Sequence, residues 1–202
     1  MTDSTEVTQT TSDSISPEFD PKRPIQSGIS MLKAVLLSPR KFFIGFSEDG
    51  PIKGPILFVM LVTAVTATLQ LALTLTFGSN DAASVGISTL QALAFVLISP
   101  LLVAVFAGTY LLSIRTFVGP VGTFRGTYRM LAYAYGVMVL FWIPVLKAFA
   151  FAYATLVLMV ICIHYVHRTT LLNALITALV AYVPIAVGFI WLQFYITGLA
   201  FG

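Results

Sequence analysis

The stretch PILFVMLVTAVTATLQLALTLTF, residues 55–77, contains no charged side chain. A helix of about 20 mostly apolar residues is long enough to cross the roughly 30 Å hydrocarbon core of a bilayer. The threonines within it can bond their own helix backbone, so they do not prevent burial in lipid. The stretch therefore predicts a membrane-spanning helix.

The composition of the whole chain agrees with this prediction. Of the 202 residues, 58% are hydrophobic and 9% are charged, whereas soluble domains average about 25% charged residues. Such a chain cannot cover itself with a polar surface, which excludes a water-soluble globule. A single cysteine excludes a disulfide scaffold. From residue 54 onward six charged residues remain: Asp81, Arg115, Arg125, Arg129, Lys147 and Arg168.

The uncharged intervals between these six residues predict an all-α membrane protein, a bundle of about five transmembrane helices. The intervals lack the polar–apolar alternation of a membrane barrel. The third interval has only 17 uncharged residues, about 25 Å of helix. Either Arg129 and Lys147 extend to the two interfaces and complete the span, or the segment is a re-entrant hairpin. The five helices are expected near 55–77, 85–113, 129–146, 148–166 and 170–195.

The basic residues predict the orientation, because they are retained on the cytoplasmic side. Ten of the eleven fall in the N-terminal region, the second-to-third loop and the fourth-to-fifth loop, which share one side in a five-span chain. Lys147 is alone on the other side, beside Asp81. We therefore expect a cytoplasmic N-terminus and a C-terminus that is outside or lumenal. The first 50 residues contain no apolar region typical of a signal peptide.

The N-terminal region divides into two parts ahead of the predicted transmembrane domain, residues 51–202. Residues 1–27 are rich in Ser, Thr and acids, a composition typical of a disordered cytoplasmic tail. Residues 28–50 form a basic segment with apolar residues at helical spacing, which predicts an interfacial amphipathic helix. Phenylalanine rings can enter the acyl boundary while cations meet anionic headgroups. The alternative is a docking surface for a cytosolic partner. The expected membrane-interface residues are Lys33, Arg40, Lys41, Phe42 and Phe43.

The predicted spans contain little that points to chemistry. Pro100 and Pro184 lie near the middle of two spans, where each permits a kink that is either packed by its neighbours or part of a transport pathway. His164 and His167 share a helical face, but Cys162 points elsewhere, so interfacial or hydrogen-bonding roles are favoured over a metal site. No nucleophile, phosphate-binding or metalloprotease motif is present. We expect no enzyme, with no catalytic residue, cofactor or metal.

Two stretches nevertheless resemble a known family. TFRGTYRMLAYAYGVMVLFWIP (123–144) and HRTTLLNAL (167–175) are similar to the Yip-domain family, the Ypt/Rab-interacting membrane proteins and their prokaryotic relatives. SPRKFF (38–43) resembles a segment that precedes the first span in prokaryotic members, and the resemblance covers about residues 35–195. The positions that match the family motif are Arg129, Ala132, Tyr133, Trp142, Pro144, His167, Thr169 and Ala174.

The resemblance implies a five-span bundle with a cytoplasmic N-terminus and a non-enzymatic role. Eukaryotic members bind prenylated GTPases and one another, but their Asp-Leu-Tyr-Gly-Pro motif is reduced here to residues 49–51, so a prokaryotic cell-membrane protein fits better. We expect a membrane-organising or trafficking-type adaptor. The alternative is a small permease or channel near Pro100 and Pro184. The expected partners are the lipid bilayer, anionic headgroups and membrane or cytosolic proteins, with a homo-oligomer left open and no nucleic acid.

Overall fold

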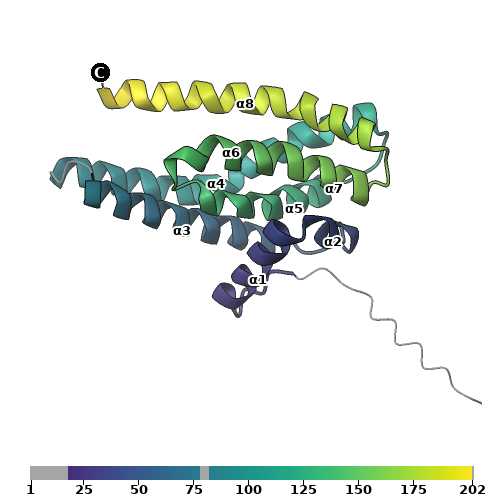
Figure 1. Cartoon of the computed structure of the whole chain (residues 1–202), viewed down its shortest axis with the longest axis horizontal. Coiled ribbons are helices and arrows are strands. Elements are labelled where there is room, and N and C mark those ends of the chain that lie inside the picture. The colour runs from purple at the N-terminus through teal and green to yellow at the C-terminus, as the bar shows by residue number, and fades with distance from the viewer. Residues whose placement is uncertain (1–17, 78–81, 202) are drawn as a thin grey trace, which may run out of the picture.

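The computed structural model describes residues 18–77 and 82–201, and every regular element in these ranges is helical (Figure 1). Only the backbone is described for residues 82–84 and 192–201. The all-α fold class is confirmed. The predicted disordered tail lies largely outside the described residues. In chain order the elements are α1 (Pro24–Leu37), α2 (Pro39–Ile44), α3 (Lys53–Phe77), α4 (Ala82–Phe117), α5 (Phe124–Ala134), η1 (Tyr135–Leu140), η2 (Pro144–Leu146), α6 (Lys147–Ala152), η3 (Tyr153–Val157), α7 (Leu158–Val166) and α8 (Leu171–Phe201).

Four helical stretches within the described residues are long and apolar enough to cross a membrane: Lys53–Phe77, Val85–Phe117, Pro144–Val166 and Leu171–Trp191. The third of these, which runs from η2 through α7, is the interior one. Half of its most apolar window is buried by protein, against 22% for α3 and 17% for α4. Figure 1 shows α6 and α7 between α8 and the helices α5 and α3. The outer helices therefore present their apolar side chains to lipid.

The third predicted helix, near 129–146, is present as α5 followed by the 3₁₀ helix η1. Every residue of α5 from Gly126 to Ala134 is buried, so this segment belongs to the protein interior. The chain changes from α-helix to 3₁₀ helix where η1 passes close to α1 and α3. A Cβ on Gly136 would lie 3.1 Å from side-chain atoms of both Leu32 and Phe58. Because 3₁₀ helix rises about 2.0 Å per residue, α5 and η1 together extend about 28 Å. Whether this segment fully crosses the bilayer stays a prediction.

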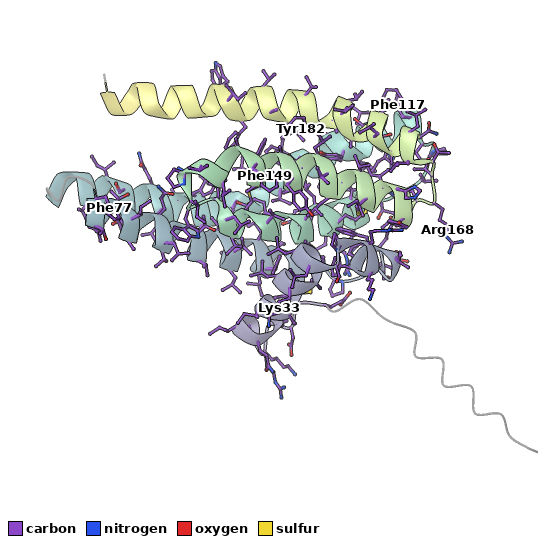
Figure 2. All side chains as sticks on the ribbon, viewed as in Figure 1. Lys33, Phe77, Phe117, Phe149, Arg168 and Tyr182 are labelled. Carbon is purple, nitrogen blue, oxygen red and sulfur yellow. The ribbon has the colours of Figure 1, made fainter. Side chains whose placement is uncertain are left out.

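The loops that contain arginine or lie between arginine-containing helix ends are at one end of the bundle. A Cβ on Gly122, in the α4–α5 loop, would lie 3.0 Å from the ring of His167, which follows α7. Helix α2 packs at the same end, since its Arg40 donates a hydrogen bond from Nε to the hydroxyl of Tyr165 at 2.7 Å. Helix α1 lies against the side of the bundle, where a Cβ on Gly28 would lie 3.0 Å from the side chain of Leu61 in α3. Figure 2 shows Arg168 at this end and Phe77 toward the opposite one. The structure thus places α2 and these two loops at one end, as expected whether the segment near 129–146 crosses the bilayer or is a re-entrant hairpin.

Polar groups inside the spans are satisfied locally. The hydroxyls of Thr63 and Thr66 donate to carbonyls one turn back, as predicted, and Thr66 also reaches the carbonyl of Met138 in η1 at 3.1 Å. Pro100 cannot donate to the carbonyl of Val96, and the hydroxyl of Ser99 donates to it instead at 3.0 Å. The carbonyl that Pro100 leaves free in α4 is therefore satisfied by the preceding residue.

Candidate functional site

Arg129 of α5 is the largest fully buried side chain among the described residues, with 1% of its surface exposed. Its guanidinium donates to Glu18 Oε1 at 2.5 Å and to the carbonyl oxygen of Pro51 at 3.2 Å. The same group lies 5.6 Å from the ring centroid of Phe46. A buried charge is costly unless it is paired and hydrogen-bonded. Arg129 therefore joins the segment before α1 and the α2–α3 loop to α5.

Local sequence places Arg129 where these segments meet. The hydroxyl of Thr123 caps α5 by accepting a hydrogen bond from the Gly126 N–H at 3.0 Å. The helical repeat then puts Gly126, Arg129 and Tyr133 on one face. The ring of Tyr133 packs beneath Arg129, with centroids 5.7 to 6.2 Å from those of three phenylalanines: Phe42, Phe46 and Phe58. An aromatic layer thus separates the guanidinium from the apolar core.

A second carboxylate contact lies beside α5. Glu48 Oε1 is 3.5 Å from His167 Nδ1, and the histidine side chain is only 2% exposed. Burial lowers the pKa of His167 below its ordinary value of 6.5, and the Glu48 carboxylate opposes that shift. Glu48 also lies next to the first turn of α5, where the helix dipole favours a negative charge. We call Glu18, Glu48, Arg129 and His167 the charge cluster.

Two glycines leave room for the charge cluster. A Cβ on Gly126 would lie 2.5 Å from Glu48 Oε2, and a Cβ on Gly50 would overlap the guanidinium of Arg129. Neither carboxylate nor guanidinium can move far, because each is held by its partner. The absence of a side chain at positions 50 and 126 is therefore a steric requirement of the cluster.

The other candidate ligands take structural roles. His164 Nδ1 lies 2.6 Å from the carbonyl oxygen of Thr169, so Nδ1 carries the proton and donates. Cys162 is buried. Within residues 18–77 and 82–201, no three His, Cys, Asp or Glu side chains are grouped so that they could hold a metal ion. The contact of His164 agrees with the hydrogen-bonding role favoured from the sequence.

The family-motif residues fall in two places. Arg129 and His167 belong to the charge cluster, and Ala132 and Tyr133 continue the same helix into the core. Thr169 accepts the hydrogen bond of His164, and Ala174 is fully buried where α8 packs. At the other end of the α5–η1 segment, a half-buried Trp142 and an exposed Pro144 form the turn into η2. The motif therefore marks the charge cluster and the turn opposite it.

The predicted membrane-interface residues are divided between core and surface. Phe42 and Phe43 are 3% and 0% exposed, so their rings pack inside the protein and not at its surface. Lys33, Arg40 and Lys41 are exposed. We call α1 and α2 together the head. The large apolar side chains that the head does expose are Ile25, Ile29, Leu37 and Ile44. Lipid contact by the three cations stays a prediction.

Comparison with known proteins gives the family. The sequence model of the Yip1 domain matches residues 33–192 of the 202. The chain belongs to the Yip1 domain family. No curated protein and no solved structure matches it significantly. This Yip1 domain protein is an integral, multi-pass membrane protein, and the family resemblance inferred from the sequence is confirmed.

Sequence reasoning missed the two acids of the charge cluster. The composition of residues 1–27 places Glu18 in the predicted tail, and the sequence pattern indicates no role for Glu48. A signal was nevertheless available, because seven of the eight acids precede residue 50 while Arg129 directly precedes an uncharged stretch, residues 130–146. A buried arginine requires a partner, and only those acids and Asp81 could supply one. Spacing along the chain could not identify which acid it is.

We predict that Gly50→Ala destabilises the protein by about 2 kcal/mol, because the new methyl group displaces the Arg129 guanidinium from its partners. In an Arg129→Gln background the same substitution should cost at least about 1 kcal/mol less. Gly86→Ala is the control, since its Cβ meets no atom within 4 Å. The measurement is the free energy of unfolding in mixed micelles. Additive effects of the two substitutions would show that Gly50 does not act through Arg129.

We also predict that acid destabilises the protein through His167. Because burial lowers its pKa when folded, the unfolded chain binds the proton more readily. The stabilisation is present above about pH 6.5 and is lost as the pH falls through the lower folded pKa, by at most about 1.4 kcal/mol per pH unit. Melting temperatures between pH 7.5 and 5 measure it. His167→Gln should flatten the profile and His164→Gln should not; equal slopes in all three proteins would contradict this assignment.

Proposed function

We propose that this Yip1 domain protein is a non-enzymatic adaptor that organises membrane or partner proteins and uses its head as the contact surface. The supporting observation is that the head is fixed to the bundle yet keeps an outward surface. Gly28, Met31 and Val35 of α1 pack inward, whereas Ile25 and Ile29 are 72% and 50% exposed. A rigid surface loses little conformational entropy when it binds a partner.

The chemistry of the head suits an anionic surface. Lys33, Arg40 and Lys41 are exposed beside the apolar side chains of α1 and α2. Each such cation near an anionic leaflet contributes about 1 kcal/mol. In this proposal the head meets lipid headgroups and, at the same surface, membrane or cytosolic proteins. Residues 28–50 form the basic interfacial segment of this arrangement, and residues 51–202 form the transmembrane domain.

The proposal includes an orientation. Helix α2, the α4–α5 loop and the α7–α8 loop lie at one end of the bundle. Six of the eleven Lys and Arg residues lie in or near these segments, which supports a cytoplasmic location for that end: Arg40, Lys41, Arg115, Arg125, Arg129 and Arg168. The C-terminus is then outside, and the membrane is a prokaryotic cell membrane.

A transport function receives less support. The side chains of Gln91 and Asn173 are exposed on the outside of the bundle, whereas a pathway would place them inside. The carbonyl of Val96, which Pro100 leaves without its helical donor, accepts a hydrogen bond from the hydroxyl of Ser99. It is therefore not available to coordinate an ion. The groove beside Pro100 is lined by apolar side chains and the ring of Tyr128. No observation on the described residues favours a permease or channel over the adaptor.

The orientation is tested with single cysteines in a Cys162→Ser background. We expect Arg125→Cys to react with a membrane-impermeant maleimide only after the cells are permeabilised, because the loop it adjoins is cytoplasmic. Asp81→Cys, on the opposite side by the charge distribution, should react in intact cells. Labelling of Arg125→Cys in intact cells would invert the orientation and remove the head from the cytosol.

The contact surface is tested by placing a photo-crosslinking amino acid at Ile29 or Lys33. We expect protein adducts from both exposed positions and none from the matched control at Met31, which is 0% exposed on the same helix. Lys33→Gln with Lys41→Gln should reduce the adducts formed at Ile29, whereas Arg168→Gln, exposed at the same end but outside the head, should not. Adducts with lipid alone would mean that the head is a membrane anchor and would defeat the adaptor proposal.

A further inference from the structure

A groove of about 400 Å³ opens on the side of the bundle where α3, α4 and α5 meet. Each helix contributes residues one turn apart, so three helical faces converge on it. The outer wall is open, because Leu97 and Leu101 of α4 are 70% and 64% exposed. The groove is thus continuous with the surface that the membrane-spanning helices present to lipid. Its lining residues are Ile52, Ile56, Leu97, Pro100, Leu101, Ala104, Phe124 and Tyr128.

One of the lining residues has a polar atom without a partner. The hydroxyl of Tyr128 is buried and has no hydrogen-bond partner among the described residues. The tyrosine as a whole is 3% exposed. A buried polar group without a partner costs about 1–3 kcal/mol. A ligand that enters the groove with an acceptor beside Tyr128 would remove that cost.

Two cationic residues are sequence neighbours of residues that line the groove. Lys53 adjoins Ile52 at the start of α3, and Arg125 adjoins Phe124 at the start of α5. Both side chains are exposed, and neither forms a salt bridge with another residue of the described ranges. An apolar groove, a hydroxyl donor and nearby cations match the acyl chain, ester carbonyl and phosphate of a phospholipid, in that order along the molecule.

We propose that this groove binds one acyl chain of an anionic glycerophospholipid from the surrounding bilayer. The chain lies against α3 and α4, the hydroxyl of Tyr128 donates to the ester carbonyl, and the headgroup faces Lys53 and Arg125. This site is separate from the head and the charge cluster. Lipid binding in the groove does not depend on whether the head binds proteins.

The experiment uses the full chain in vesicles of phosphatidylcholine and phosphatidylglycerol with a trace of phosphatidylglycerol that carries a photoreactive group in its acyl chain. Labelled peptides are identified by mass spectrometry. Unlabelled phosphatidylglycerol is then added in its diester and diether forms. We expect saturable labelling of residues 97–104, with the diester competing about fivefold better than the diether, the factor for one hydrogen bond.

Two substitutions and a control localise the effect. Tyr128→Phe should abolish the preference for the diester while it leaves labelling in place. Ala104→Trp should fill the groove and lower labelling of residues 97–104 to the level of the exposed lipid-facing surface. Leu112→Trp, at a position of α4 that is 69% exposed, is the matched control and should change neither result. Melting temperatures in detergent verify that each variant is folded.

Several outcomes would overturn the proposal. Labelling of residues 97–104 that does not saturate and matches that around Leu112 would mean annular lipid only. Equal competition by diester and diether in the wild type would remove Tyr128 from the site. Displacement by a free fatty acid as effective as by phosphatidylglycerol would identify a different occupant. If Ala104→Trp does not fold, the Tyr128→Phe comparison still decides.

Discussion

The guanidinium of Arg129 is the constraint on which the charged end of this protein depends. A permanent charge with 1% exposure has to be paired, and the partners come from segments that would otherwise leave the bundle. Glu18 brings the chain before α1 onto α5, and the carbonyl of Pro51 fixes the α2–α3 loop. Gly50 follows from the same constraint, because only a residue without a side chain fits beside the guanidinium. One buried ion therefore constrains both the segment before α1 and the α2–α3 loop.

The rest of the bundle is constrained by the surrounding lipid. Outside the protein no water is available to satisfy a backbone group, so every departure from regular helix needs an internal partner. The hydroxyl of Ser99 supplies one at Pro100, and the threonines of α3 supply others to their own helix and to η1. The hydroxyl of Tyr110 reaches the carbonyl of Thr155 in the π-helical turn η3. Polar side chains in these spans thus support backbone irregularities.

The sequence predicts the lipid-facing helices well because charge is excluded from them. Residues 53–77 and 85–117 match the predicted spans closely. The prediction is weaker for the segment near 129–146, since a helix surrounded by protein can contain Arg129 and tyrosines that lipid would not accept. The contacts that join Glu18 to Arg129 and Glu48 to His167 link residues more than 100 positions apart. Helical spacing contains no information about such contacts.

The head shows why local amphipathicity is ambiguous in a membrane protein. An apolar stripe beside cations fits a lipid interface, and it fits equally well a helix that packs on a bundle. The rings of Phe42 and Phe43 pack on the bundle, because Tyr133 and Phe46 form an aromatic pocket that excludes both water and lipid. The cations at 40 and 41 are thereby held at the surface next to a buried core. Their position is set by protein packing. The outward surface of the head therefore keeps the same shape in contact with lipid headgroups or with a protein.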